Sequence, residues 1–155
     1  MRVLEFLNTH APTLRTDSTL QDAIDKLDLY QVTLLPVLDE TGAVRGIVTE
    51  RQLFERLFER YLQAQVAGEP LPALAELQEM ARAQAHIAIT QWMMPDPPVI
   101  DERAPIEKAV ELMHAHALDT LPVSGEGRFV GTIRLVDCCQ ALLEENHEPN
   151  DRPAD

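Results

Sequence analysis

The sequence predicts an α/β (α+β) fold built from two copies of one β-α-β-β-α unit. The first observation is a repeated tripeptide, Leu35-Pro36-Val37 and Leu121-Pro122-Val123. The second is a constant offset of 86 positions between matching residues on either side of it. The third is that each copy shows the same order of apolar periodicities and turn signals. Duplication of a folded unit accounts for all three.

Matching residues keep the offset of 86 up to the turn after the tripeptide, and an offset of 85 beyond it. Before the turn the pairs are Pro12 and Pro98, Leu20 and Ile106, Ala23 and Ala109, Ile24 and Val110, and Leu27 and Met113. After the turn they are Gly42 and Gly127, Gly46 and Gly131, Val48 and Ile133, and Gln52 and Asp137. A single deletion at an expected turn is consistent with two copies of one fold.

Each copy begins with an extended piece, which is followed by a helix, a strand, a turn, a second strand and a second helix. In the first copy we expect the extended piece at 12–15, the helix from Leu20, the strand at 33–38, the turn at 39–42, the second strand at 44–48 and the second helix from Glu50. In the second copy we expect the extended piece at 98–101, the helix from Ile106, the strand at 119–124, the turn at 125–127, the second strand at 129–133 and the second helix from Val136. Asp17 or Ser18 is expected to cap the first helix and Asp101 its counterpart, where Pro105 suits an early helical position. Their expected apolar stripes are Leu20, Ala23, Ile24 and Leu27, and Ile106, Ala109, Val110 and Met113.

A long segment separates the copies, so the chain divides into 1–56, an insertion at 57–89, 90–145 and a disordered tail at 146–155. Apolar residues at helical spacing predict that the helix after Thr49 continues to Val66, and that a second helix spans 73–88. The Gly- and Pro-containing stretch 68–72 separates them. These helices either pack their apolar sides on the two repeats or form a dimerisation or partner-docking surface.

Composition excludes several partners. The chain has 155 residues, of which 45% are hydrophobic, and a net charge of -13. Broad binding to nucleic acid or to an anionic membrane needs a basic face, so neither is expected. The two cysteines, Cys138 and Cys139, are adjacent and close too small a loop to act as a staple, so we expect reduced thiols in the cytoplasm, with a redox pair as the alternative.

Each copy resembles a CBS domain, and the two together resemble a CBS domain pair, or Bateman module, of the stand-alone tandem type. The pattern is Leu-Pro-Val, a turn, a strand and then Gly-x-x-(Thr/Ser)-x-x-Asp. It covers about residues 5–56 and 90–143, ending in Gly46 to Gln52 and in Gly131 to Asp137. The stretch 92–97 also resembles the Met-Thr-Pro opening of this family. The resemblance implies pseudo-twofold packing of the units, with two clefts between them, and association of two chains into a flat homodimer.

The resemblance also implies that the clefts bind adenosine-containing ligands such as AMP, ADP, ATP or S-adenosylmethionine, with no cofactor required. An aspartate at the start of the last helix would accept hydrogen bonds from the ribose hydroxyls. The preceding hydroxyl residue would lie near a helix N-terminus, which favours phosphate. Neither copy keeps both groups. The second has Asp137 but Arg134 replaces the hydroxyl, and the first has Thr49 but Gln52 replaces the aspartate.

We therefore expect the cleft at Asp137 to be the stronger site. By analogy its residues are His10, Pro12, Thr13, Val32, Thr33, Ile133, Arg134 and Asp137. Arg134 could bind a phosphate, form a surface salt bridge, or block the cleft by pairing with a carboxylate.

The other cleft is expected to be empty or weak, because Asp96 and Asp119 add negative charge that disfavours phosphate. Its residues are Thr49, Gln52, Pro98, Val99, Leu118 and Asp119, with Asp96 beside them.

The expected function is a regulatory module that senses a nucleotide and signals to an unidentified protein partner. The alternative is a ligand-free structural or dimerisation module. An enzyme is a weaker third reading, because the sequence has no Gly-rich phosphate loop, Ser/His/Asp order or zinc spacing. His114 and His116 are two residues apart, so on a helix they make a poor metal pair and are interpreted as a solvated helix end. No metal site is expected.

Overall fold

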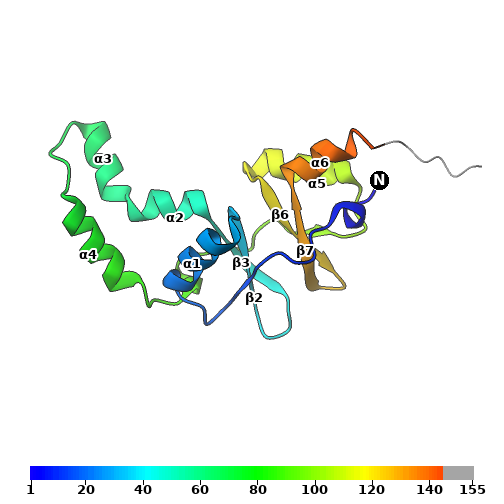
Figure 1. Ribbon diagram of the computed structural model, residues 1–155, viewed down its shortest axis with the longest axis horizontal. Coiled ribbons are helices and arrows are strands. Elements are labelled where there is room, and N and C mark those ends of the chain that lie inside the picture. The colour runs from blue at the N-terminus through cyan, green and yellow to red at the C-terminus, as the bar shows by residue number, and fades with distance from the viewer. Residues whose placement is uncertain (145–155) are drawn as a thin grey trace, which may run out of the picture.

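Two sheets, each with its own helices, form the body of the molecule, and a helical arm projects from one end (Figure 1). The computed structural model describes residues 1–144, so the tail expected at 146–155 lies outside the described residues. The mixed α+β class and the tandem β-α-β-β-α units are confirmed.

The two repeats have the same topology. The first contains β1 (Leu14–Arg15), α1 (Leu20–Tyr30), β2 (Leu34–Leu38), β3 (Val44–Thr49) and α2 (Glu50–Leu57). The second contains β5 (Ile100–Asp101), α5 (Ile106–His116), β6 (Thr120–Gly125), β7 (Arg128–Arg134) and α6 (Leu135–Ala141). In each, a two-residue strand pairs parallel with the Leu-Pro-Val strand, which pairs antiparallel with the next. A further strand, β4 (Met94–Pro95), extends the first sheet beside β3.

Each repeat completes its core with a segment that precedes the other repeat. Val3, in the 3-10 helix η1 (Val3–Phe6), is fully buried in the core of the second repeat. Ile89, in η2 (Ile89–Gln91), and Trp92 are buried in the core of the first. Val3 and Ile89 are 86 positions apart, so the exchange is itself repeated. The two repeats are thus structurally interdependent, which the divisions at residues 56 and 90 do not show.

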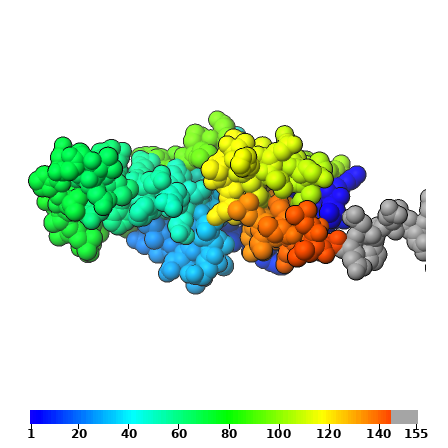
Figure 2. Space-filling view, turned by 90° about the horizontal axis from the view of Figure 1, so that it is seen from above, coloured from blue at the N-terminus to red at the C-terminus, as the bar shows by residue number. Residues whose placement is uncertain are grey.

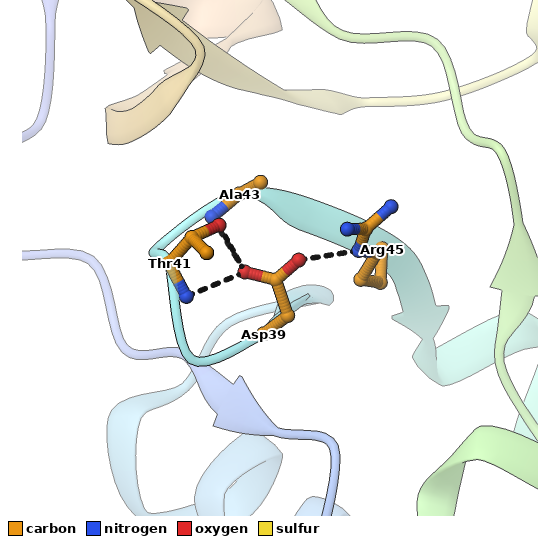
Figure 3. A network of polar contacts seen from close by, with 4 residues as sticks. All are labelled: Asp39, Thr41, Ala43 and Arg45. Carbon is orange, nitrogen blue, oxygen red and sulfur yellow. Dashed lines mark hydrogen bonds and ion pairs between the residues drawn. The ribbon is translucent and has the colours of Figure 1, made fainter.

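The β2–β3 turn joins the repeats at a second place. Asp39 accepts hydrogen bonds from the hydroxyl and the backbone N–H of Thr41 and pairs with Arg45 (Figure 3). The carbonyl oxygen of Gly42, in the same turn, accepts a hydrogen bond of 2.8 Å from the N–H of Phe129 in β7. The carboxylate therefore orders a turn that contacts the second sheet.

The predicted helix caps are wrong in both repeats. Thr19 caps α1: its hydroxyl accepts the N–H of Asp22, whose carboxylate accepts the N–H of Thr19. Ser18 instead caps a turn, accepting the N–H of Arg15. Asp101 ends β5 and accepts the N–H of Arg103, while Pro105 takes the cap position of α5. The sequence alone cannot show which of several adjacent oxygen-bearing side chains reaches the helix N-terminus.

The expected apolar stripes are too wide by one residue in each repeat. Ile24 is 38% exposed and Val110 is 50% exposed, whereas the other stripe residues are buried. Because each helix covers a sheet of only three or four strands, its buried face is narrow. The two equivalent positions leave apolar side chains on the surface.

The insertion contains α3 (Glu59–Ala67) and α4 (Leu74–Gln84), which project from the body and do not lie on either sheet (Figure 1). Packing on the repeats, one of the two expected roles, is therefore not observed. The single helix expected up to Val66 is also interrupted, because the backbone at Phe58 departs from helical geometry with φ -100° and ψ 12°. Phe54, Phe58 and Tyr61 line the same apolar cavity across this break, so their spacing does not reveal it.

Candidate functional site

The two repeats touch at their pseudo-twofold axis through one hydrogen bond between side chains. The hydroxyl of Thr33 donates to a carboxylate oxygen of Asp119 at 2.7 Å. These residues are 86 positions apart, so they occupy equivalent places in the two repeats. Equivalent positions can meet only on the axis that relates the copies. The residues just before β2 and β6 are thus brought to the centre of the molecule.

A cavity of about 1140 Å³ opens beside this axis, between α2 and the C-terminal end of α5. Figure 2 shows the atoms of these two helices next to each other on one face of the molecule. The cavity is lined by the following residues expected in the second cleft: Thr49, Gln52, Leu118 and Asp119, together with Thr33. Pro98 and Val99 are half-buried and do not line it, and Asp96 is exposed.

Thr49 and Gln52 are held in place by the start of α2. The hydroxyl of Thr49 caps this helix, accepting the N–H of Gln52 at 3.1 Å. The side-chain amide of Gln52 donates to the carbonyl oxygen of Trp92 at 2.6 Å. Its Oε1 atom is buried and has no hydrogen-bond partner within the described part of the protein. A buried acceptor without a partner is costly, so a donor that reached this atom would stabilise it.

The cavity wall carries both signs of charge. Its carboxylates come from Glu50, Glu55, Glu59 and Asp119, and its guanidinium groups from Arg51 and Arg56. Arg56 lies over the ring of Trp92 at 4.0 Å and donates to the carbonyl oxygen of Gln91 at 2.8 Å. Arg56, in the last turn of α2, is therefore tied to the segment that returns from the arm.

The expected site at Asp137 has a different structure. Its carboxylate accepts from Arg134 Nη2 at 3.0 Å, from Arg134 Nε at 3.3 Å and from the backbone N–H of Arg134 at 2.8 Å. Asp137 is only 7% exposed. Both carboxylate oxygens are therefore engaged within the chain, and a ribose would have to displace the arginine. Of the three alternatives for Arg134, the structure shows a salt bridge at the surface, with the Arg134 side chain 54% exposed.

The other residues expected with Asp137 come from several elements of the fold. Ile133 is fully buried in the core of the second repeat. Val32 and Thr33 line a separate cavity of about 540 Å³ beside α1 and α2. His10 is exposed, and Pro12 and Thr13 are half-buried, with the carbonyl oxygen of Thr13 accepting from Lys26 at 2.6 Å.

Sequence reasoning missed several residues of the larger cavity. Glu55, Arg56 and Glu59 follow Gln52 at helical spacing, and this spacing is the signal that could have placed them on the same face. His116 is an exposed residue at the end of α5, as expected, and it also lines the cavity. That contact joins two repeats, so no local pattern predicts it.

The comparison with known families agrees with this architecture. The model of the CBS domain matches twice, at residues 3–59 and 88–144. The chain belongs to the CBS domain family. It therefore shares a module that is generally regulatory and not catalytic.

Among curated proteins, the chain is similar to a CBS domain-containing protein of Dictyostelium discoideum. The two are 28% identical over 135 residues, which cover 85% of this chain and 84% of the relative. The fold resembles that of CBSX2 in complex with AMP, with a TM-score of 0.69, 22% identity, and coverage of 92% and 96%.

It also resembles the CBS domain pair of protein MJ0100 in complex with 5′-methylthioadenosine and S-adenosyl-L-methionine. The TM-score is 0.65 with 19% identity, and the coverage is 92% and 95%. These two likenesses show the fold.

Among the helices of residues 1–144, none combines the length and the apolar character that crossing a bilayer requires.

Proposed function

We propose that this CBS domain pair is a regulatory module that binds an adenosine-containing ligand between its repeats and signals to a protein partner. The observation that carries the proposal is the cavity at the pseudo-twofold axis, whose wall takes polar side chains from both repeats. A ligand held there would contact α2 and α5 at once. Because the two repeats share this ligand, binding would favour one relative arrangement of them over others.

The ligand class is supported by the similar structures. One holds AMP, and another holds 5′-methylthioadenosine and S-adenosyl-L-methionine. AMP, ADP, ATP and S-adenosylmethionine are therefore the ligands to test first. The proposed role is recognition without bond-making, so no turnover of ATP is expected in a phosphate-release assay.

We place the ligand in the cleft of Thr49 and Gln52 and not in that of Asp137, which reverses the order expected from the residues alone. The side chain of Gln52 lines an open cavity, and its buried Oε1 atom has no partner within the described residues. Asp137 is almost fully buried, and its oxygens already accept from Arg134. A neutral amide makes a weaker bond to a ribose hydroxyl than a carboxylate does, so binding is expected to be moderate.

The test is calorimetric titration and thermal unfolding with adenosine, AMP, ATP and S-adenosylmethionine. A ligand at 100 times its Kd adds about 2.7 kcal/mol of stability, which is several degrees for a domain of this size. Gln52→Ala is expected to weaken binding, and Gln140→Ala, which removes an exposed amide on α6, is the matched control. No heat and no shift with any ligand would contradict the sensor.

Arg134→Ala and Asp137→Ala test the other cleft. If that cleft is the site, Asp137→Ala abolishes binding while Gln52→Ala does not. Weaker binding of AMP but not of adenosine in Arg134→Ala would mean that the arginine contacts phosphate. Tighter binding would mean that the arginine blocks the cleft.

The second candidate function is a ligand-free structural or dimerisation module, which the exposed apolar residues favour. Ile24 and Val110 occupy equivalent positions and remain exposed, so a second chain related by twofold symmetry could cover both. A homodimer is expected in sedimentation experiments, and the double variant Ile24→Asp/Val110→Asp should dissociate it. Val66→Asp is the control, because Val66 is 91% exposed on the arm.

The arm is the second surface that could receive a partner. Its described residues enclose an apolar cavity of about 370 Å³, lined by residues such as Phe58, Leu62 and Leu74. If the arm and not the repeats holds the homodimer together, Val66→Asp dissociates it and the double variant does not.

A further inference from the structure

The electrostatics of the cavity at the pseudo-twofold axis constrain the ligand further. Four carboxylates line it against two guanidinium groups. One of those two, Arg56, is stacked on Trp92 and donates to a backbone oxygen, so its hydrogen-bonding capacity is partly used within the protein. The other, Arg51, lies 5.8 Å from the ring of Phe54. The cavity wall is therefore negative overall.

The helix N-terminus at the cavity is poorly suited to phosphate. A helix N-terminus attracts anions because its first N–H groups are free and its dipole is positive. At α2 the hydroxyl of Thr49 already takes the N–H of Gln52. Glu50, in the first turn, adds a carboxylate to the cavity wall. A phosphate placed here would meet a capped helix end and a like charge.

The opposite helix end at the cavity favours a cation. Helix α5 ends at His116, and residues 116–118 line the cavity. The carbonyl groups at a helix C-terminus form the negative end of its dipole, which attracts positive charge. This contribution comes from the other repeat and is independent of the carboxylates on α2.

Asp119, which follows this helix end, has an oriented side chain. One oxygen, Oδ1, accepts hydrogen bonds from the hydroxyls of Thr33 at 2.7 Å and Thr120 at 3.1 Å. These bonds orient the carboxylate where both repeats meet at the cavity. An oriented anion beside a negative helix end is a suitable binding point for an ammonium or a sulfonium group.

We propose that this cavity selects a nucleoside whose 5′ substituent is positively charged, and discriminates against phosphorylated nucleotides, with Asp119 as the specificity-determining residue. This inference rests on the proposed function, because it assumes that the cavity binds an adenosine-containing ligand. It adds the charge class of that ligand, which the likeness in fold does not decide.

The test compares four probes of one nucleoside by calorimetric titration: 5′-amino-5′-deoxyadenosine, adenosine, AMP and ATP. Affinity is expected to fall in that order. Added salt is expected to weaken binding of the amine and to strengthen any residual binding of ATP, because screening reduces both attraction and repulsion. Tighter binding of AMP or ATP than of adenosine would overturn the inference.

Asp119→Asn removes the charge and keeps an acceptor for the hydroxyl of Thr33. It is expected to weaken binding of the amine about two- to fivefold, the range for a solvent-accessible charge pair, and to change binding of adenosine less. Glu126→Gln, in the β6–β7 turn, removes the same charge outside the cavity and is the matched control. Equal effects of both substitutions would mean that net charge, and not Asp119, sets the preference.

The two proposals fail differently. If none of the four probes binds, the proposed function fails as a whole. If adenosine binds and Gln52→Ala weakens it, but phosphate improves affinity, the function stands and only the charge preference is wrong.

Discussion

Asp39 shows how one side chain orders a turn that joins the two repeats. The hydrogen bond from the hydroxyl of Thr41 is the largest influence on its pKa, and N–H groups and Arg45 act in the same direction. Against a smaller opposing effect of desolvation, they lower the pKa of Asp39 from 3.8 to about 2. The ionised form is therefore the one that these donors stabilise (Figure 3).

We expect Asp39→Asn to reduce stability at neutral pH and to matter progressively less in acid. The pKa of Asp39 is lower in the folded state than in the unfolded state. The contribution of its carboxylate to the stability of the folded protein is therefore complete above about pH 4 and disappears as the pH falls through about 2. Urea unfolding of the wild type and the variant between pH 7 and pH 2 should give curves that converge. Glu40→Gln, at the exposed neighbouring position, is the control, and a constant difference down to pH 2 would contradict the assignment.

At the scale of elements, two glycines allow the exchanged segments to cross the sheets. Gly46 in β3 pairs with Pro95, and Gly131 in β7 lies against Asn8. A Cβ at Gly131 would collide with the backbone oxygen of Asn8 and come within 2.9 Å of the side chain of Leu7. The sequence shows that the two glycines occupy equivalent positions. Only the structure shows why glycine is needed there, because another segment of the chain lies directly against each strand.

Gly131→Ala is therefore expected to destabilise the protein by about 1–3 kcal/mol, the usual cost of overpacking. Gly125→Ala is the matched control in the neighbouring strand, since a Cβ there would meet only the end of the Glu102 side chain. Chemical unfolding measures both. Equal losses would mean that the close approach to Asn8 is not the cause.

The arm is an element of a different kind, because it has little core of its own. Of α3 and α4, only Ala64 and Leu77 are buried. Helices of this length are marginal in water without tertiary packing. We expect amide hydrogens of both to exchange at least about tenfold faster than those of α1 and α5, as measured by hydrogen exchange and mass spectrometry. Protection equal to that of α5 would show that a second chain or a partner covers the arm.

At the scale of the whole molecule, the exchange of leading segments makes two repeats into one folding unit. Val3 is packed in the second core, while Trp92 is packed in the first. Neither repeat has a complete core without a segment that precedes the other repeat in sequence. A substitution that destabilises one core should therefore also destabilise the other core.

Val3→Ala removes two buried methyl groups and is expected to lower stability by about 1–3 kcal/mol. The midpoint followed by Trp92 fluorescence, which reports on the first core, should shift as far as that followed by circular dichroism. Val66→Ala, at a 91% exposed position, should shift neither of these two midpoints. Two separate transitions, with only one sensitive to Val3, would contradict a single cooperative unit.

Local sequence determined the duplicated unit, the strands and the order of the elements, because apolar periodicity and turn residues act over short distances. It also identified Thr49, Gln52, Leu118 and Asp119, which the structure brings to one cavity. Only the tertiary structure decided that Thr33 and Asp119 meet on the axis and that Val3 and Ile89 complete opposite cores. These contacts depend on how two similar units are placed against each other, and that placement has no signature within either unit.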